Sequence, residues 1–366
     1  MKNTFGNSIS VTLFGESHGK EIGAVLDGIA PGIDIDEEFI SSRLDLRRPW
    51  GKISTQRSET DNFRIVSGVF NGYTTGTPIC ILIPNKDTDS SKYDSLSVTP
   101  RPGHADYTAF CKYHGFQDYR GGGHFSGRIT APRVAAGAIL LQALKAKGIN
   151  IGTHIYSIGK VKDEEFDNTN LNSSIDALNS SLFAVLDEAK GVLMQEEISN
   201  AAKEGDSVGG ILETAVTGIP AGVGEPWFDT AEGVLSHALF SVPGIKGVEF
   251  GAGFSVAQMR GSECNDNFRF ENGAVVTDTN NNGGINGGIT NGMPLTFRVA
   301  VKPTPSIFAS QNTVDLKKEE NAVLSLTGRH DPCIVHRARA VVDSVTAIAL
   351  ADLLCTRFGT DWLRGE

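Results

Sequence analysis

The chain has 366 residues, of which 40% are hydrophobic and 21% charged, an ordinary composition for a globular protein. Its formal net charge of −10 argues against a general nucleic-acid binder, because such a protein needs a basic surface to neutralise phosphates. The five cysteines are widely spaced without a Cys-x-x-Cys pair, which predicts neither a disulfide framework nor a zinc site and favours a reducing compartment. Because the N-terminus lacks an apolar signal core and no run of about 18 apolar residues occurs, we expect a cytoplasmic protein without membrane contact.

The N-terminal third alternates predicted strands with polar loops. Its predicted elements are strands at residues 9–14, 22–26, 63–70 and 78–83 and a helix at residues 36–46. The last two strands are expected to form a hairpin around the turn Asn71-Gly72. Composition alone favours a solvated linker for residues 47–57. Residues 85–98 form a polar loop that is long enough to be a lid or a binding loop.

The most informative stretch is a glycine loop followed by a helix. Three consecutive glycines at residues 121–123 let the backbone turn sharply and approach a bound group. Thr130 and Pro132 predict the cap and first turn of a helix that ends at Gly148. The arginines around this loop are Arg120, Arg128 and Arg133. A helix N-terminus among cations favours an anion site, although the stretch matches no Walker or Gly-x-Gly-x-x-Gly pattern, and a tight turn with solvated arginines is the alternative.

The C-terminal half adds helices predicted at residues 195–203, 229–239 and 340–358 and strands predicted at residues 209–216 and 295–301. Asp229 and Glu232 resemble a capping box with the aspartate at the cap. The loop 280–288, rich in glycine and asparagine, is expected to hold neither helix nor strand and to offer N–H groups to a polar ligand. Residues 149–193 suggest no chemistry, and His154 within them is expected at the surface.

The order of the elements predicts the fold class. Helices and strands do not alternate strictly, which argues against a doubly wound parallel sheet. There is no internal repeat at a fixed period and no linker that would divide the chain into two domains. We therefore predict an α+β fold in which residues 1–366 form a single domain.

Titratable residues in glycine- or proline-containing loops are the candidates for chemistry. They are His18, His104, His124 and Asp331. Histidine exchanges protons near neutral pH, so acid–base catalysis is indicated, although a lone histidine is more often structural. The absence of a Cys/His cluster and of a His-Glu-x-x-His spacing makes metal catalysis unexpected. The residues alone predict an enzyme that acts on a small phosphorylated or carboxylated anion.

Six motifs allow a more specific hypothesis. They are Gly15-Glu-Ser-His-Gly19, Arg101-Pro-Gly-His-Ala-Asp-Tyr107, Asp118-Tyr-Arg-Gly-Gly-Gly123, Arg133-Val-Ala-Ala-Gly-Ala-Ile139, Lys302-Pro-Thr304 and Gly328-Arg-His-Asp-Pro332. In this order they resemble the chorismate synthase family. The resemblance implies a β-α-β sandwich, a homotetramer, and 1,4-anti elimination of phosphate from 5-enolpyruvylshikimate 3-phosphate, with reduced FMN required but not consumed. No nicotinamide-binding domain is recognisable. We therefore expect that a separate flavin reductase supplies reduced FMN and that this chain does not reduce FMN with NADPH itself.

The resemblance also implies roles for individual residues. His18 would protonate the departing phosphate, His104 would protonate or stabilise the reduced flavin near N1, and Asp331 would lie near flavin N5 and help to accept the substrate proton. The implied contacts to the substrate or to the FMN phosphate are Arg47, Lys52, Arg101, Arg128 and Arg329. The implied flavin contacts are His124, Phe125, Ser126, Pro243, Gly244, Gly287, Lys302, Pro303, Thr304, Pro305, Ser306 and Arg329.

The chain departs from the family pattern near the implied flavin site. His124, Phe125 and Ile129 stand where the family commonly has arginine, serine and glutamate, and Pro243-Gly244 replaces Asn-Ala. Lys52 stands for an arginine in a loop that is one residue shorter. Weak flavin binding is one meaning of these changes. Two alternatives to the lyase therefore stay open: a relative that binds a phosphorylated ligand without turnover, and a flavin-independent phosphotransferase.

Overall fold

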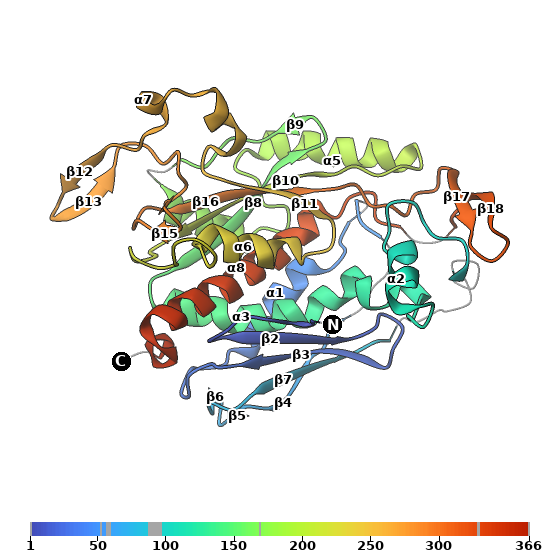
Figure 1. Ribbon diagram of the computed structural model, residues 1–366, viewed down its shortest axis with the longest axis horizontal. Coiled ribbons are helices and arrows are strands. Elements are labelled where there is room, and N and C mark those ends of the chain that lie inside the picture. Colours follow the sequence, from blue (N-terminus) through green and yellow to red (C-terminus); the bar gives the residue numbers. More distant parts are fainter. Residues whose placement is uncertain are drawn as a thin grey trace.

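The computed structural model describes residues 2–51, 53–55, 60–86, 97–167, 170–327 and 330–364. Two antiparallel sheets lie on either side of a layer of helices, with the first sheet at the bottom and the second at the top of Figure 1. This arrangement is the expected β-α-β sandwich of α+β type. None of the helices in these ranges is long and apolar enough to cross a membrane.

The first sheet has the strand order β1-β2-β3-β7-β4, and its neighbouring strands are antiparallel. Its strands are β1 (Thr4–Phe5), β2 (Ser10–Gly15), β3 (Glu21–Asp27), β7 (Ile79–Pro84) and β4 (Arg64–Ser67). On β3 and β7 the register pairs Ile22 with Ile83 and Leu26 with Ile79, and all four side chains are fully buried. Alternate residues thus form the apolar face that packs on the helices.

The second sheet has the strand order β11-β16-β10-β8-β9. Its strands are β11 (Ile245–Phe250), β16 (Leu295–Val301), β10 (Gly210–Thr217), β8 (Asn150–Ile158) and β9 (Val161–Lys162). The surface position expected for His154 is wrong, because this β8 residue is 0% exposed. Its Nδ1 lies 3.0 Å from Asp163 and its Nε2 2.9 Å from Glu213, so polar groups and not only apolar ones are buried on this sheet.

The helical layer contains α1 (Glu37–Arg47), α3 (Thr130–Ala146), α6 (Ala231–Phe240) and α8 (Val335–Phe358). Helix α3 packs against α8 and also contacts strands of both sheets, and nearly all of its apolar side chains are buried. Gly137 allows the close approach of the two helices, because a Cβ there would lie 2.4 Å from Cβ of Ser344. A helix covered from both sides buries most of its circumference.

The remaining elements surround the sandwich. The further helices are α2 (Asp106–Tyr113), α4 (Leu171–Ser180), α5 (Glu188–Lys203) and α7 (Gly261–Cys264). The small hairpins are β5 (Val69–Phe70) with β6 (Tyr73–Thr74), β12 (Phe268–Glu271) with β13 (Ala274–Thr277), β14 (Ile285–Asn286) with β15 (Ile289–Thr290), and β17 (Gln311–Asp315) with β18 (Glu320–Leu324). In Figure 1 the β12–β13 hairpin projects from the body of the molecule.

Several predicted boundaries need correction. Helix α5 begins seven residues before the predicted position 195, where Asp187 caps it by accepting from the N–H of Ala189. Helix α8 begins five residues before position 340, because buried side chains such as Val335 and Ala338 extend it. The loop 280–288 does contain one strand, β14, which pairs with β15 across Gly287-Gly288, whose φ angles are 62° and 87°. The cap of α6 is Thr230 and not Asp229, because the Thr230 side chain accepts from the N–H of Gly233.

The predicted cap of α3 is also wrong. Ile129 occupies the cap position, and the Thr130 hydroxyl instead donates to the carbonyl of Gly127 at 2.6 Å. The predicted hairpin turn Asn71-Gly72 is confirmed, although it joins the short strands β5 and β6. The central part of the predicted lid loop, residues 87–96, lies outside the described residues.

Candidate active site

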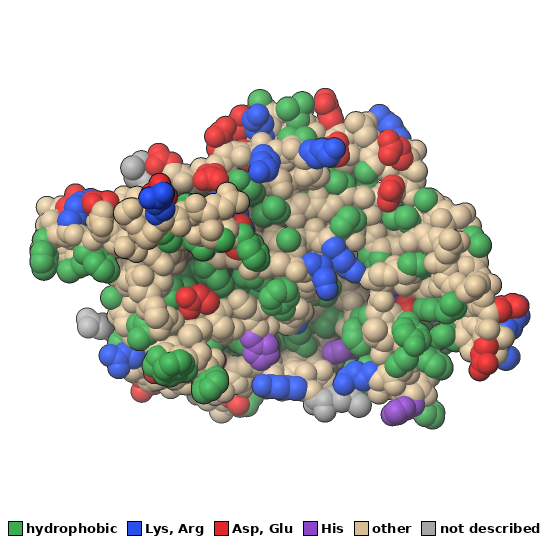
Figure 2. All heavy atoms as spheres, turned by 45° about the horizontal axis from the view of Figure 1, so that its top comes forward, with side chains coloured by type: hydrophobic (Ala, Val, Ile, Leu, Met, Phe, Trp, Pro, Cys, Tyr) green, Lys and Arg blue, Asp and Glu red, His purple; other side chains and the backbone are tan. Residues whose placement is uncertain are grey.

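A cavity of about 670 Å³ opens where α1 ends and where α3 and α8 begin. This volume is typical of pockets for small molecules and cofactors. The N-termini of two long helices carry partial positive charge, which favours an anionic ligand. Figure 2 shows a hollow in the middle of one face, with cationic and histidine side chains at its edges.

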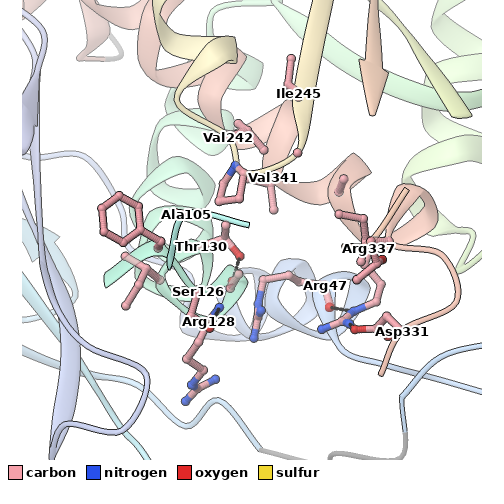
Figure 3. Close-up of a pocket in the computed structure, with 18 of the residues that line it drawn as sticks. Arg47, Ala105, Ser126, Arg128, Thr130, Val242, Ile245, Asp331, Arg337 and Val341 are labelled. Atoms are coloured by element: carbon pink, nitrogen blue, oxygen red, sulfur yellow. Dashed lines mark hydrogen bonds and ion pairs between the residues drawn. The ribbon is translucent and has the colours of Figure 1, made fainter. Parts of the chain in front are cut away.

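The cavity combines a cationic wall and an apolar wall. In Figure 3, Arg47 and Arg128 lie on one side and Val242 and Val341 on the other. The apolar side comes from the segment after α6 and from the first turns of α8. The cavity therefore suits a ligand with an anionic group and an extended apolar surface.

Most of the sequence-predicted site residues line this one cavity. They are Arg47, His104, His124, Phe125, Ser126, Arg128, Pro243, Gly244, Lys302, Pro303, Thr304, Pro305, Ser306 and Asp331. Three others do not line it: His18, Arg101 and Gly287. Lys52 and Arg329 lie outside the described residues. Loops that are far apart in the sequence thus converge on a shared space, as the resemblance implies.

His18 lies directly behind the cavity wall. It is 8% exposed and packs on Gly121, a lining residue, where a Cβ would be 2.2 Å from the imidazole Cε1. The Ser17 hydroxyl donates to the carbonyls of Arg120 and Gly121 and lies 3.0 Å from His18 Nδ1. The Ser17 hydroxyl thus links the imidazole of His18 to the backbone of the glycine loop. Glycine at position 121 is required for this contact.

His104 and Arg101 share one carboxylate, that of Asp106. His104 Nδ1 lies 2.5 Å from Asp106, and the Arg101 guanidinium forms two bonds of 2.8 Å to its two oxygens. Burial alone would raise the pKa of Asp106, but the hydrogen bonds and charges of Arg101 and His104 hold it well below its usual range. Arg101 therefore stands behind His104 and not at the cavity surface.

Arg47 and Arg128 meet at Asp61, a residue that sequence reasoning missed. The fully buried Asp61 carboxylate accepts from Arg47 at 2.5 Å and also from Arg128. Burial would raise the pKa of Asp61, but the two guanidinium groups lower it below its ordinary value. The interpretation of residues 47–57 as a solvated linker is wrong for Arg47, which is buried because this ion pair holds it at the end of α1.

Asp331 is held in a fixed orientation near the C-terminal end of α1. It accepts from the backbone N–H of Thr55 at 2.9 Å and from Arg337 at 2.6 Å (Figure 3). Arg337 also donates to the carbonyl of Arg47 at 2.9 Å and so links Asp331 to the end of α1. The sequence offers no sign of this pairing, because Arg337 is six residues from Asp331 across the start of α8.

The three arginines around the glycine loop do not all face the cavity. Arg128 and Arg133 line the cavity, whereas Arg120 pairs with Asp118 and does not line it. Arg133 donates to the backbone carbonyl and the hydroxyl of Ser241. Burial lowers the pKa of Arg133 to about 10, which still leaves it protonated at neutral pH. Two of the three arginines from which an anion site was predicted thus face the cavity.

The lining residues fit a flavin mononucleotide. Thr304 presents a buried hydroxyl that finds no hydrogen-bond partner within the described ranges. Lys302 precedes it, and its ammonium is anchored on the carbonyl of Gly103 at the cavity edge. A hydroxyl, nearby cations and an apolar wall match the polar edge, phosphate and ring of that cofactor. By contrast, the described residues contain no cluster of His, Cys, Asp and Glu that could hold a metal ion.

Comparison with known proteins gives a consistent result over almost the whole chain. The family model described as chorismate synthase matches residues 9–355. Chorismate synthase of Thermococcus gammatolerans is 49% identical over 352 residues, which are 96% of this chain and 97% of the relative, and that of Pyrococcus abyssi is also 49% identical over 352 residues, with the same coverage. A solved structure titled "Crystal Structure of Chorismate Synthase" has a TM-score of 0.77 and 31% identity, covering 97% of this chain and 94% of that one.

These matches decide between the interpretations that the sequence left open. They support the lyase and give no support to a non-catalytic relative or to a phosphotransferase. The chain belongs to the chorismate synthase family of carbon–oxygen lyases, which serve aromatic amino acid biosynthesis by eliminating phosphate from 5-enolpyruvylshikimate 3-phosphate.

Proposed function

We propose that the cavity holds reduced FMN and 5-enolpyruvylshikimate 3-phosphate side by side while phosphate is eliminated. The observation that carries this proposal is the division of one cavity into a cationic and an apolar wall. Guanidinium groups bind phosphate and carboxylate by paired hydrogen bonds, so Arg47 and Arg128 suit an ester with several negative charges. The apolar wall suits the face of a flat ring.

The chain's own residues would bind, orient and exchange protons. His18 would give a proton to the leaving phosphate, and His104 would protonate or stabilise the reduced flavin near N1. The Asp331 carboxylate, fixed by Thr55 and Arg337, would help to accept the proton that the substrate loses. When bound, reduced FMN supplies an electron transiently, which assists loss of the allylic phosphate without net oxidation.

The remaining contacts follow from the positions of the lining segments. Lys302 and Thr304 would bind polar groups of FMN. His124 and Phe125, which differ from the usual family pattern, also line the cavity. An imidazole in place of a guanidinium offers fewer donors, which favours weaker binding of FMN than in relatives with arginine. Lys52, Arg101, Gly287 and Arg329 stay as proposed contacts.

The assembly and setting of the enzyme are proposals of the same kind. A homotetramer is supported by large aromatic side chains that the single chain leaves exposed, among them Trp227, Phe228, Phe268 and Phe270. We further propose that residues 1–366 form one domain, that an external reductase supplies reduced flavin, and that the enzyme works in the cytoplasm. One continuous core that includes residues of both sheets supports the single domain.

An anaerobic assay tests the function. The protein is mixed with reduced FMN and 5-enolpyruvylshikimate 3-phosphate, and chorismate absorbance and free phosphate are followed together. We expect both products in equal amounts and neither without reduced FMN. Phosphate release that is unaffected by omitting flavin, or tight binding without phosphate release, would contradict the proposal.

Substitution of the two histidines tests their roles. His18→Ala and His104→Ala should each lower kcat much more than the affinity for substrate, because both act on protons. The matched control is His237→Ala, an exposed residue of α6 that contacts the ring of Phe5. An equal loss in the control would remove the support for the two catalytic roles.

A further inference from the structure

We infer that Asp106 is a positioning residue that holds His104 in the state with a proton on Nδ1, so that Nε2 is the nitrogen that exchanges protons in the cavity. The inference rests on the proposed role of His104 in the reaction. It concerns a carboxylate that does not line the main cavity.

The hydrogen-bond geometry determines which ring nitrogen carries the proton. His104 Nδ1 lies 2.5 Å from Asp106 Oδ1 and 3.1 Å from Nη2 of Arg101. A guanidinium only donates hydrogen bonds, and an ionised carboxylate only accepts them. A contact of 2.5 Å between an oxygen anion and a nitrogen lone pair would be repulsive. The proton must therefore lie on Nδ1, between the imidazole and the carboxylate.

Arg101 fixes the carboxylate itself. Its Nε and Nη2 each lie 2.8 Å from one oxygen of Asp106, and its backbone N–H donates to Oδ2 at 3.0 Å. The remaining nitrogen, Nη1, lies 3.3 Å from the hydroxyl of Ser306, which lines the cavity. The ion pair keeps Asp106 ionised and able to accept. The carboxylate thus cannot rotate away from the imidazole without breaking several bonds.

The opposite edge of the imidazole is left open by a glycine. A Cβ on Gly122 would lie 3.1 Å from Cε1 and 3.2 Å from Nε2 of His104, and φ at Gly122 is +84°. A side chain at this position would crowd the imidazole and would be strained by the positive φ, so glycine is favoured. Among the described residues none forms a hydrogen bond with Nε2. With Nδ1 committed to Asp106, Nε2 is the nitrogen available to a ligand.

This arrangement prepares His104 for proton exchange in both directions. The neutral ring can accept a proton at Nε2, and the imidazolium that forms can donate it again. An asparagine in this position would instead offer an N–H to Nδ1, which favours the opposite tautomer with the proton on Nε2.

The test compares Asp106→Asn with Asp106→Glu in the full-length enzyme. For Asp106→Asn we expect kcat to fall by about 10²-fold, within the range typical of general acid–base groups, with a much smaller change in KM. Asp106→Glu should recover part of the activity, because it restores an acceptor. Asp278→Asn is the matched control, since Asp278 pairs with Arg269 on the exposed β12–β13 hairpin.

A spectroscopic readout separates positioning from a loss of folding. The chain has eight histidines, and magic-angle-spinning ¹⁵N spectra of histidine-labelled protein report which ring nitrogen is protonated. The His104 signals are assigned by their loss in His104→Gln. We expect a protonated Nδ1 in the unsubstituted enzyme and a protonated Nε2 with unprotonated Nδ1 in Asp106→Asn.

Three results would overturn the inference. The first is an unprotonated Nδ1 in the unsubstituted enzyme, the second an unchanged tautomer in Asp106→Asn, and the third an unchanged kcat in that variant. Failure of the unsubstituted enzyme to form chorismate would instead refute the proposed function. The protonation state of His104 would still be measured in that case, so the two failures are distinguishable.

Discussion

Replacement of His154 by glutamine should destabilise the protein substantially without touching the active site. His154 lies on β8, fully buried, and donates to Asp163 from one nitrogen and to Glu213 from the other. Since both ring nitrogens face carboxylates, the imidazole is protonated in the folded protein. Glutamine has a similar size but no charge, so the variant loses the ion pairs and keeps most of the volume.

The structure sets the size of the effect. Breaking a buried ion pair typically costs about 3–5 kcal/mol, because the remaining charge is left without compensation. Here both carboxylates keep other partners: Asp163 accepts from the N–H groups of Leu186 and Asp187, and Glu213 is bound by Arg298. We therefore expect His154→Gln to lower the free energy of unfolding by about 3 kcal/mol, the lower end of that range.

The effect should depend on pH with a defined sign. Burial alone would lower the pKa of His154, but the hydrogen bonds and charges of Asp163 and Glu213 raise it above its ordinary value. A group whose pKa is raised by folding stabilises the protein fully below its unfolded pKa, about 6.5 for histidine. That stabilisation is lost as the pH rises through the folded pKa. The difference between the two proteins should therefore shrink at alkaline pH.

Urea unfolding followed by tryptophan fluorescence measures these free energies. His154→Gln is compared with the unsubstituted protein below the ordinary pKa of histidine and at alkaline pH, with the exposed His237→Gln as the control. A difference below about 1 kcal/mol at the lower pH would refute the reasoning, because that is the size typical of exposed ion pairs. A difference that grows with pH would show that the imidazole is buried neutral.

Three further predictions concern the cavity and the core. Asp61→Asn should lower the free energy of unfolding by about 3 kcal/mol, because it removes the charge that compensates two arginines. Inorganic phosphate should stabilise the variant more than the unsubstituted protein in urea unfolding, because both arginines line the cavity and carry less compensated charge in the variant; equal stabilisation of both would contradict this. Gly121→Ala should abolish chorismate formation, since its Cβ would clash with His18 at a φ of +59°, whereas Gly261→Ala, with open space around it, should stay active in the same assay. Asp352→Ala should cost about 2–3 kcal/mol in urea unfolding, because its carboxylate accepts from three successive backbone N–H groups near the N-terminus; a loss as small as that of an exposed residue would argue against this role.

Local sequence signals predicted the elements best where one face is apolar and a cap or turn ends them. The helix over residues 36–46 is an example, since Asp36 caps α1 by accepting from the N–H of Phe39. The prediction was poorer for α8, which lies between the sheets, buries most of its circumference and so lacks a sharp apolar stripe. The start of α8 is set by tertiary contacts and not by a cap.

Motifs predicted the main residues of the candidate site, but they did not predict the charged residues that hold those residues in place. His104 and Asp331 stand in short glycine- or proline-containing motifs, so their chemistry is visible in the sequence. Asp61 and Arg337 are isolated residues that acquire meaning only when the fold brings them to Arg128 and Asp331. No local pattern encodes such a pairing across distant segments. His154 was misassigned for the same reason, since its two partners come from other segments of the chain.

The close approach of α3 and α8 at Gly137 and Ser344 has a consequence for how the enzyme can change. Both helices carry cavity residues on their first turns, so the distance between their axes sets the width of the ligand site. A bulkier side chain at the crossing would act as a wedge and spread the two walls, although it lies beyond the ligand's reach. A change of substrate specificity that needs a wider site would therefore have to begin with the packing of α3 on α8, where even one added methyl group does not fit.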